Sequence, residues 1–349
     1  MRRAHGPVPF RSSRGPRTRY LLAAAAGITV IAAAGCSAGG TSAGSTVSST
    51  ITIAAIPGID TAPLYLAQRD GMFAAEGLTH VVIRTYPTEA ADLSALANGQ
   101  ADIAASDYGD IFYAQSQNPD LRILGDGYDA TAGVLEVVTL PSKSGITSPA
   151  QLANQRIGVP AEQVLPGLTG SGPVSLDAAA ATQVLTNYLG NAAQYVQWVP
   201  MSQQQEIAAL QSGQLAAALI SEPYIYEAES EFGVTEVLDA CSGSTASLPL
   251  TGYVATKAWV KHNPSTVADF QAAVASAQTQ ATMTGQVQQI LPKTTGMTVA
   301  DADLSTIGSY PTSTSAINLE RVVRLMSNFN MIKSGRPPSV PPMIVRTGS

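Results

Sequence analysis

Charged residues, cysteine and histidine are all scarce in this sequence. Of its 349 residues 13% are charged and 45% are hydrophobic, and there are two cysteines and three histidines. A disordered chain is richer in charge and poorer in aliphatic residues, so the composition predicts a globular protein, and the length indicates about two domains. His80 and His262 have no nucleophile or acid arrangement beside them, and no nucleophile-elbow, phosphate-binding or metal-ligand motif occurs. We therefore expect a protein that is not an enzyme and has no cofactor or metal.

The basic residues are unevenly placed. Six of the 19 are arginines that precede the first acidic residue, Asp60, which leaves 13 basic against 25 acidic residues in the rest. The formal net charge of that remainder is −12, whereas the whole chain has −6. A strongly acidic body repels phosphate backbones, so nucleic acid is excluded as an expected partner.

The N-terminus is typical of an export signal. A basic stretch is followed by an apolar run over Leu21–Ala34, and Ala33-Ala-Gly-Cys36 resembles the bacterial lipobox. In lipobox proteins the cysteine becomes the new N-terminus and carries lipid, so we expect a signal peptide over 1–35 and a lipid such as palmitate on Cys36. The alternative is a transmembrane helix, which needs roughly 20 apolar residues, whereas this run has about 14. Residues 36–50 are rich in Ser, Thr, Gly and Ala, which predicts a flexible tether.

The second cysteine, Cys241, has no disulfide partner if Cys36 carries lipid. No basic residue or histidine lies near it in the sequence to stabilise a thiolate. We interpret Cys241 as a small hydrophobic side chain near a strand end rather than as a reactive thiol.

Strands alternate with helices along the body of the chain, which predicts an α/β layer structure. Glycine ends several of the expected helices, and Ser175 is placed as the N-cap of a long Ala-rich one. The expected strands are 51–56, 81–83, 102–105, 121–124, 135–140, 156–160, 195–199 and 216–220, and the main expected helices are 62–72, 90–97, 175–189, 203–211, 266–282 and 319–329.

One segment recurs 114 residues later in the chain. Ala95-Leu-Ala-Asn-Gly-Gln-Ala-Asp-Ile-Ala104 is echoed by Ala209-Leu-Gln-Ser-Gly-Gln-Leu-Ala-Ala-Ala218. In both copies a helix ends at glycine, a short strand follows, and polar residues come next. Chance similarity in an Ala-rich chain is the alternative. We interpret the echo as two lobes on one α/β plan, each presenting a polar strand end to a cleft between them, where ligands of open α/β sheets bind.

A series of short motifs runs in order from about Ile51 to Ile332. The motifs are Pro63-Leu-Tyr-Leu-Ala67, Gly71-Met-Phe73 with Glu76-Gly-Leu78, Ala95-Leu96 with Gly99 and Asp102, Gly145-Ile-Thr-Ser-Pro-Ala-Gln-Leu152 with Arg156-Ile-Gly-Val159, Glu222-Pro223, and Asn263-Pro264 before Phe270. In this order they resemble the solute-binding lipoproteins of ATP-binding-cassette importers, in the branch that takes nitrate, sulfonates, taurine and thiamine-pyrimidine precursors. Ala216 departs from the pattern, because the family often has Asp there, and we interpret that Asp as structural.

The resemblance implies a two-lobed α/β architecture, the type II periplasmic-binding-protein fold, with the ligand cleft between the lobes. On that template lobe one is 51–139 plus 252–349 and lobe two is 140–251. The implied function is to capture a small organic molecule by hinge closure and to deliver it to the membrane permease of an importer, while the lipid holds the protein on the extracytoplasmic face of the cell membrane. Two alternatives stay open: a ligand-sensing lipoprotein without a transporter, and an exported enzyme on the same fold.

Polar residues at the strand ends of lobe one are candidate ligand contacts. Asp60 and Thr61 follow the first strand, and Asp60 either bonds a cationic or N–H-bearing ligand or caps the helix after it. Ser106, Asp107 and Tyr108 end the third strand. Tyr108 can stack on a ring, and Asp107 can instead cap the next helix.

Lobe two contributes three further candidates. Ser171 lies in Gly170-Ser-Gly172 before the Ser175 helix, where free backbone N–H groups attract anions or carboxylates, or where the chain simply forms a loop. The resemblance implies that Glu222 and Tyr224 face the same cleft, with a hinge or interlobe contact as the alternative for Glu222. We expect Trp198 and Tyr65 to lie in the core.

The sign of the candidates indicates the kind of ligand. Asp60, Asp107, Asp110 and Glu222 gather near the predicted cleft, and no Arg or Lys does. Sulfonate or nitrate prefers a basic group or several N–H donors. The sequence therefore favours a neutral or cationic organic ligand, such as a nitrogen heterocycle, over sulfonate or nitrate.

Overall fold

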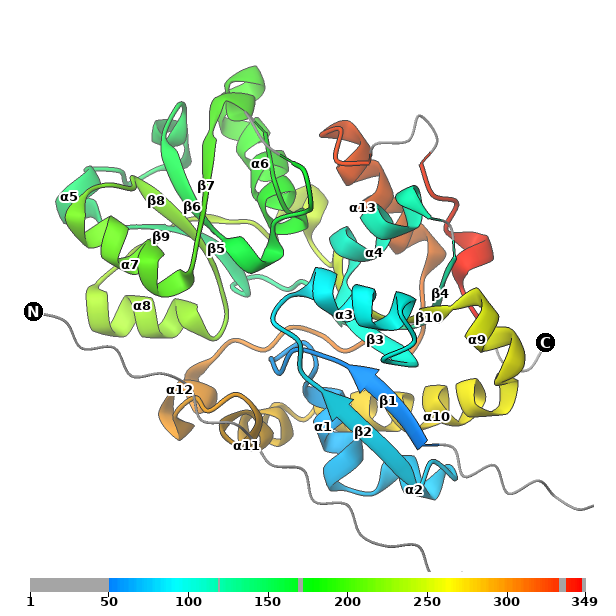
Figure 1. Ribbon diagram of the computed structural model, residues 1–349. Helices are drawn as coiled ribbons and strands as arrows, with labels where there is room; N and C mark the ends of the chain where they lie inside the picture. Colours follow the sequence, from blue (N-terminus) through cyan, green and yellow to red (C-terminus); the bar gives the residue numbers. More distant parts are fainter. Residues whose placement is uncertain (1–49, 119, 169–171, 333–336, 347–349) are drawn as a thin grey trace, which may run out of the picture. The chain divides into compact units, whose positions relative to one another are not determined.

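The structure is a computed structural model that describes residues 50–118, 120–168, 172–332 and 337–346 (Figure 1). These residues belong to one compact unit. The predicted signal peptide and Cys36, together with Ser171, lie outside the described residues. Among the helices of the described part, none combines the length and the hydropathy of a membrane span.

Two five-stranded sheets form the framework (Figure 1). Sheet A has the strand order β2-β1-β3-β10-β4, and sheet B has the order β7-β6-β8-β5-β9. We call the described residues of 50–129 and 249–346 half A, and 135–239 half B. The strands are β1 (Thr50–Ala54), β2 (His80–Arg84), β3 (Ile103–Asp107), β4 (Leu121–Asp129), β5 (Leu135–Thr139), β6 (Arg156–Pro160), β7 (Gln197–Met201), β8 (Ala217–Ser221), β9 (Thr235–Asp239) and β10 (Pro249–Thr256).

The two sheets share one topology. In sheet A the strands β2, β1 and β3 are parallel and β10 is antiparallel to β3, whereas in sheet B the strands β7, β6 and β8 are parallel and β5 is antiparallel to β8. The antiparallel strand is in each case the one that arrives from the other half. The prediction of an α/β protein with two lobes on one plan is therefore confirmed.

The predicted lobe boundaries need a correction of one strand. The prediction places Leu135–Thr139 in lobe one, but this segment is β5 and pairs with β8 and β9 of sheet B. Likewise β10 begins at Pro249, before the predicted boundary at 252, and pairs with β3 and β4 of sheet A. Each strand pairs in the sheet that it enters because its backbone groups find their hydrogen-bond partners there. A hydrophobic run does not reveal which of two sheets that is.

Several helices begin at the caps that the local sequence provides. Thr88, Ser175 and Ser202 accept backbone N–H groups at the starts of α3, α6 and α7, and Gly213 ends α7 in the left-handed conformation. The helices are α1 (Ala62–Arg69), α2 (Met72–Ala75), α3 (Glu89–Ala97), α4 (Tyr108–Gln117), α5 (Pro141–Ser144), α6 (Leu176–Leu189), α7 (Gln203–Ser212), α8 (Tyr224–Phe232), α9 (Lys257–His262), α10 (Pro264–Ala281), α11 (Thr284–Thr294), α12 (Val299–Leu304) and α13 (Ala316–Asn328), with 3-10 turns η1 (Pro149–Leu152), η2 (Ala161–Gln163), η3 (Gly190–Tyr195), η4 (Gly243–Thr245) and η5 (Pro341–Met343).

Some elements have no counterpart among the expected ones. The strand β9 is an edge strand whose first residues are exposed, so its hydrophobic pattern is weak. The helix α11 contains Pro292, and α12 has only 6 residues. Both depart from the regular periodic pattern on which helix prediction depends.

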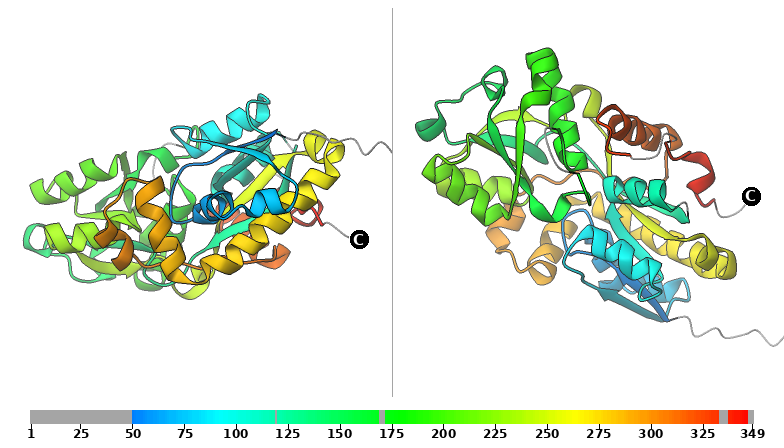
Figure 2. Two further views of the ribbon diagram at one scale, coloured as in Figure 1. Left: turned by 90° about the horizontal axis from the view of Figure 1, so that it is seen from below. Right: turned by 45° about the horizontal axis from the view of Figure 1, so that its top comes forward.

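Alternate residues along the strands point to different layers. In β1, Ile51 and Ile53 pack with α1 and α10, whereas Ala54 belongs to the apolar cluster on the opposite face. In sheet B, Ile157 packs toward α6, and Val138 packs with α7 and α8. Both sheets are thus covered by helices on both faces, as the turned views show (Figure 2).

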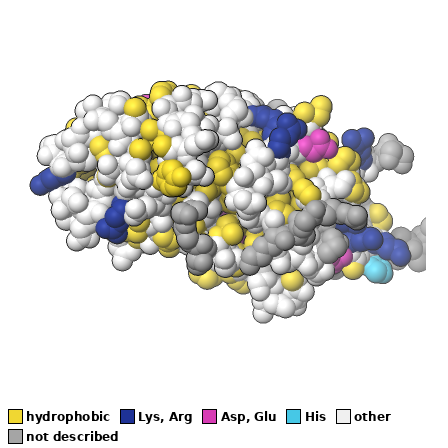
Figure 3. All heavy atoms as spheres, turned by 90° about the horizontal axis from the view of Figure 1, so that it is seen from above, with side chains coloured by type: hydrophobic (Ala, Val, Ile, Leu, Met, Phe, Trp, Pro, Cys, Tyr) yellow, Lys and Arg dark blue, Asp and Glu magenta, His cyan; other side chains and the backbone are white. Residues whose placement is uncertain are grey.

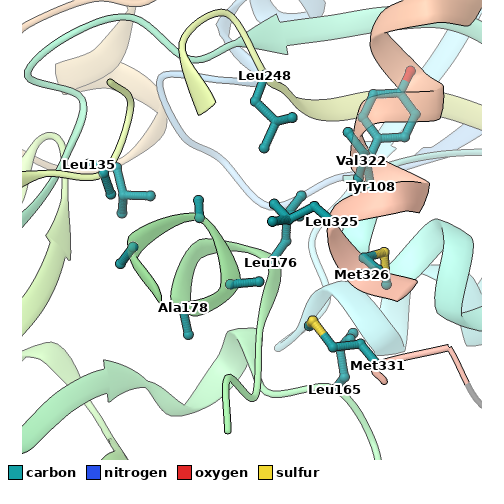
Figure 4. Packing of buried hydrophobic residues seen from close by; sticks show 14 of the residues in the cluster. Tyr108, Leu135, Leu165, Leu176, Ala178, Leu248, Val322, Leu325, Met326 and Met331 are labelled. Atoms are coloured by element: carbon teal, nitrogen blue, oxygen red, sulfur yellow. The ribbon is translucent and has the colours of Figure 1, made fainter. Parts of the chain in front are cut away.

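One apolar cluster joins the two halves. Leu176 of α6 lies beside Leu325 of α13 (Figure 4), and Ala178 of α6, Met326 of α13 and Tyr108 of α4 are further members of the cluster. All five side chains belong to the same buried cluster. The helix α13 therefore packs against both halves and connects them through this cluster.

Candidate functional site

A cavity of about 260 Å³ lies where strand ends of the two sheets meet. The loop after β1, the start of α3 and the end of β3 line it from half A. The turn after β6, the first turn of α6 and the segment from β8 into α8 line it from half B. The cavity therefore has the position that the sequence predicts for a ligand site, at the carboxyl ends of parallel strands of both lobes.

A larger hollow of about 450 Å³ lies within half A alone, between β4, α10 and the segments 311–314 and 344–346. It does not touch the ends of the parallel strands or any residue of half B. We take the smaller cavity as the candidate site, because a cleft between two lobes at strand ends is where open α/β sheets bind ligands.

Four of the predicted contacts line the cavity: Asp60, Asp107, Glu222 and Tyr224. Tyr224 is 41% exposed and lies at the rim, whereas the three acids are only partly exposed. The structure thus brings together acidic side chains that are up to 162 positions apart in the sequence. Ser171 and Cys36 lie outside the described residues, so both stay predictions.

Asp60 belongs to a loop that is braced on both sides. The Thr61 hydroxyl donates to the Ile56 carbonyl at 2.6 Å and accepts the Gly58 N–H at 3.0 Å. The Tyr310 hydroxyl donates to the Ile59 carbonyl at 2.6 Å. Thr61 is the N-cap of α1 but makes no side-chain cap, and Asp60 does not cap this helix. Thr61 therefore shapes the loop and does not line the cavity, whereas the Asp60 carboxyl group does.

Asp107 caps α4 and also lies at the cavity, while its contact with a ligand stays a prediction. Its carboxylate accepts the Gly109 N–H and so caps α4, and the residue also lines the cavity. Glu222 likewise lies at the cavity and contacts the other half. Its Oε1 accepts the Thr306 N–H of half A at 2.9 Å, while the residue lines the cavity, so Glu222 is an interlobe contact at the site itself.

Tyr108 and Ser106 do not reach the cavity. Tyr108 is fully buried, its ring stacks on Phe112, and its hydroxyl donates to Asp126. Ser106 is 1% exposed and lies inside sheet A opposite Gly252. The expectation that Tyr108 stacks on a ligand ring is corrected: the first residue of α4 turns back over β10, where its hydroxyl would overlap a Cβ on Gly252.

The core expectations hold in part. Trp198 is 7% exposed and belongs to the cluster that joins the halves, as expected for a core residue. Tyr65 is partly buried and packs against the half A core. Cys241 is 3% exposed, and burial raises the pKa of its thiol above the usual range, which agrees with a small buried side chain rather than a reactive thiol.

Three acidic residues of the lining are absent from the sequence-based candidates. Glu89 begins α3, Asp177 is in the first turn of α6, and Glu162 lies in η2 beside Gln163. Acids are common in first helical turns because they oppose the helix dipole, so their type alone does not mark a site. The usable signal is position, since α3 and α6 each follow a parallel strand whose carboxyl end faces the cavity.

The lining carries one sign of charge. Six of its residues are acidic and none is Lys, Arg or His; the acids are Asp60, Glu89, Asp107, Glu162, Asp177 and Glu222. Charged side chains are few on the face drawn in Figure 3, where Lys and Arg form small groups and some of them adjoin an Asp or Glu. The predicted acidic character of the cleft is thus present in the geometry.

Burial and mutual repulsion raise the pKa values of these acids. Burial raises the pKa of Asp60 and of Asp177 to about 6. Burial, with the charges of Asp177, Asp110 and Glu89, raises the pKa of Asp107 well above its usual range. The acids of the two halves thus raise one another's pKa values across the cavity.

Four helices begin beside the cavity, and in each the side chain of the N-cap residue accepts a hydrogen bond from a backbone N–H group of the first turn. The caps are Asp107 on α4, Thr88 on α3, Ser175 on α6 and Ser202 on α7. A helix start attracts an anion through its free N–H groups and its dipole. Here the capping side chains and the acidic residues of the first turns already interact with part of these N–H groups and of the helix dipole, which weakens the attraction for an anion. Within the described residues no group of three or more His, Cys, Asp or Glu is arranged to hold a metal ion.

The comparisons with known proteins agree with this geometry. A family model described as NMT1/THI5 like matches residues 59–284. No curated protein matches the chain. Among solved structures, the alkanesulfonate-binding protein SsuA of Xanthomonas axonopodis pv. citri bound to MOPS has 16% identity and a TM-score of 0.63, over 85% of this chain and 98% of that chain.

Two further structures share the fold. The periplasmic aliphatic sulphonate binding protein SsuA of Escherichia coli has 16% identity and a TM-score of 0.65, over 85% of this chain and 92% of that chain. The desulfurization enzyme DszB has 17% identity and a TM-score of 0.62, over 85% of this chain and 97% of that chain. At these identities the likeness establishes the fold, which is that of the periplasmic binding proteins.

Proposed function

Because the chain belongs to the NMT1/THI5-like family, we propose that it is an extracytoplasmic solute-binding protein that captures a small organic molecule and delivers it to the permease of an ATP-binding-cassette importer. The observation that carries the proposal is the cavity of about 260 Å³ lined by strand ends of both halves. A ligand there contacts both halves at once, so binding favours the closed arrangement by its differential affinity.

The ligand is proposed to be neutral or cationic rather than a sulfonate or nitrate. The SsuA proteins bind alkanesulfonates, but six acids and no basic side chain line the cavity of this chain. An anion would meet like charges at short range in a partly desolvated site. Asp60, Asp107, Glu222 and Tyr224 are the proposed contacts, and Ser171 stays a candidate from the sequence alone.

We place the protein at the cell membrane through lipid on Cys36, after removal of the signal peptide over 1–35. The body then stays on the extracytoplasmic face beside its permease. The support is the sequence pattern: an apolar run followed by small residues and a cysteine. A single buried lipid chain binds membranes weakly, so more than one acyl chain on Cys36 is part of this proposal.

The proposed role is binding without turnover, although DszB has the same fold. The histidines His80 and His262 do not line the cavity, and neither does Cys241. With those residues elsewhere, the lining offers carboxyl, hydroxyl and amide groups but no thiol or imidazole for nucleophilic chemistry.

Membrane fractionation and uptake test the proposal together. Cys36→Ala is expected to move the protein from the membrane to the soluble fraction, while Cys241→Ser, which removes the buried thiol, stays membrane-bound. Deleting the gene is expected to abolish uptake of the ligand that co-purifies with the body from residue 45 onward. Unchanged membrane retention of Cys36→Ala contradicts the lipid anchor. Undiminished uptake contradicts the transport role.

A further inference from the structure

The cavity has an acidic wall on each side and an apolar remainder. Asp60, Glu89 and Asp107 come from half A, and Glu162, Asp177 and Glu222 come from half B. The lining also includes the apolar residues Val134, Leu135, Leu250 and Leu291. A molecule that fills this space has its ends against carboxyl groups and its body against hydrocarbon.

The acids of opposite halves act on one another. The charge of Asp177 raises the pKa of Asp107, and the charge of Asp60 raises that of Asp177. No cation in the lining offsets this repulsion. A positively charged ligand placed between the two walls removes the repulsion and replaces it with attraction on both sides, so its binding stabilises the contact between the halves.

Two lining residues each carry a buried acceptor atom that lacks a donor. Oε1 of Gln163 and Oε2 of Glu222 are both buried and have no hydrogen-bond partner among the described residues. A buried acceptor without a donor costs free energy, and an N–H group that comes within reach of it when the halves close on a ligand recovers part of that cost. A quaternary ammonium ion has no N–H to give, and its usual cage of aromatic rings is not what lines this site, where Tyr128 and Tyr224 are the aromatic residues.

We propose that the ligand is an organic cation that carries N–H groups, a protonated amine or an amidinium, on a small apolar body. The proposal rests on the solute-binding role argued above and names its substrate class. The size of the cavity agrees, since about 260 Å³ lies below the roughly 300–1,000 Å³ of sites for drug-sized ligands. The charged end lies between the carboxyl groups of Asp107 and Asp177, and the body lies against Leu135 and Leu250.

Matched probes test the charge and the N–H groups separately. Benzamidine, benzamide and benzenesulfonate share one aromatic ring and are cationic, neutral and anionic, respectively. Hexylamine, hexanamide and hexanesulfonate repeat the comparison on an aliphatic body. Hexyltrimethylammonium keeps the charge and lacks the N–H. Isothermal titration calorimetry on the full chain is expected to give at least tenfold tighter binding for the amine or amidine than for its neutral, anionic or quaternary partner.

Two variants on opposite walls test the site. Asp107→Asn keeps the cap of α4, because Asn caps as well as Asp, and Asp177→Asn keeps the shape of the first turn of α6. Each is expected to weaken binding of the cationic probe at least tenfold. Glu76→Gln, an exposed acid at the end of α2, is the matched control and leaves the affinity unchanged.

The outcomes separate this proposal from the solute-binding role. A neutral, anionic or quaternary probe that binds as tightly as its N–H-bearing cation overturns the cation class but leaves a solute-binding protein. Cation binding that Asp107→Asn and Asp177→Asn do not weaken overturns the proposed site. If no probe of any charge binds, the cation class is wrong for these bodies, and the solute-binding role then depends on the uptake experiment alone.

Discussion

The helix–strand unit α3–β3 of half A and the unit α7–β8 of half B are the same length and differ in how they end. A shift of 114 residues carries the start of α3 at Glu89 onto the start of α7 at Gln203, and the whole of β3 onto β8. The caps correspond too, Thr88 to Ser202, and so do the strand ends at the cavity, Asp107 to Ser221. The scaffold is repeated, while the side chains presented to the ligand are not.

The two units also share a buried acidic residue at the same position. Asp92 of α3 and Glu206 of α7 are related by the same 114-residue shift, and both are 0% exposed. Neither carboxyl group has a hydrogen-bond partner among the described residues. Burial raises the pKa of Asp92 to about 8 and that of Glu206 to about 9, so both are protonated at neutral pH. The comparison suggests that a neutral acid belongs to the shared plan.

The largest expected effect is on the pH dependence of stability. The folded-state pKa values of Asp92 and Glu206 lie above their unfolded values, so the native state holds more protons and its stability falls as pH rises toward about 8 and 9. Asp92→Asn and Glu206→Gln are each expected to lose about 1–3 kcal/mol at pH 5 and to gain on the order of 3 kcal/mol over the native chain at pH 9. Urea unfolding at the two pH values measures whether the order of stability of the native and variant chains reverses. Parallel curves for native and variant chains would contradict it, and the exposed Glu320→Gln is the control.

The second prediction concerns how each half makes room for its acid. The strand registers place Gly158 of β6 where half A has Ala54 of β1. A Cβ at Gly158 would lie 2.9 Å from Cγ of Glu206 and 2.8 Å from Cδ1 of Leu215, so Gly158→Ala is expected to cost about 1–3 kcal/mol. Adding Glu206→Asp, the acid of half A, should recover part of that loss in a double-mutant cycle of unfolding free energies. Strictly additive losses would argue against the pairing. Gly285→Ala meets open space and is the control.

The third prediction concerns the tie between the halves. Arg321 of α13 donates to the carbonyl oxygens of Ser244, Ala246 and Ser247, in the segment that leads from β9 back to β10. Arg321→Met keeps the apolar stem and removes these bonds, which is expected to cost about 1–2 kcal/mol. The urea unfolding transition should also broaden, because the halves then unfold less cooperatively. A variant with the native midpoint and slope would show that α13 joins the halves by apolar packing alone, and Arg324→Met on the exposed side is the control.

The smallest expected effect separates the two caps. Thr88→Ala removes one bond, the 3.1 Å contact with the Ala91 N–H, and is expected to cost about 1 kcal/mol. Ser202→Ala removes the bond to the Gln205 N–H but leaves Gln205 Oε1 on the Ser202 N–H at 3.0 Å, so it should cost less. Thermal unfolding of both variants, with Thr88→Ser as the conservative control, measures the difference. A larger loss at Ser202 would contradict this order.

The sequence predicts the repeated unit well because its signals are local. The echo around Gly99 and Gly213, the caps and the alternating apolar residues all act within a few positions. The same locality explains the errors. Whether Leu135–Thr139 pairs in sheet A or sheet B depends on strands far away in the chain, and Tyr108 turns into the core because Gly252 leaves space for its ring.

The candidate site divides along the same line. Asp60, Asp107 and Glu222 are predictable because they are polar residues at or shortly after the ends of parallel strands, where ligands of such sheets bind. Glu89 and Asp177 look like ordinary acids of a first helical turn until the fold brings them to the same cavity. The composition predicts that the charge of the site is negative, but it does not predict how many acidic residues gather there.

By itself the sequence determined an α/β body with a repeated unit, an acidic charge and polar strand ends, because these follow from local periodicity and residue type. Only the tertiary structure decided which sheet receives each crossing strand and which acids share one cavity. It also decided that the acids on its two walls raise one another's pKa values. Such properties depend on distances between residues remote in the chain, and charges act through space rather than along the sequence.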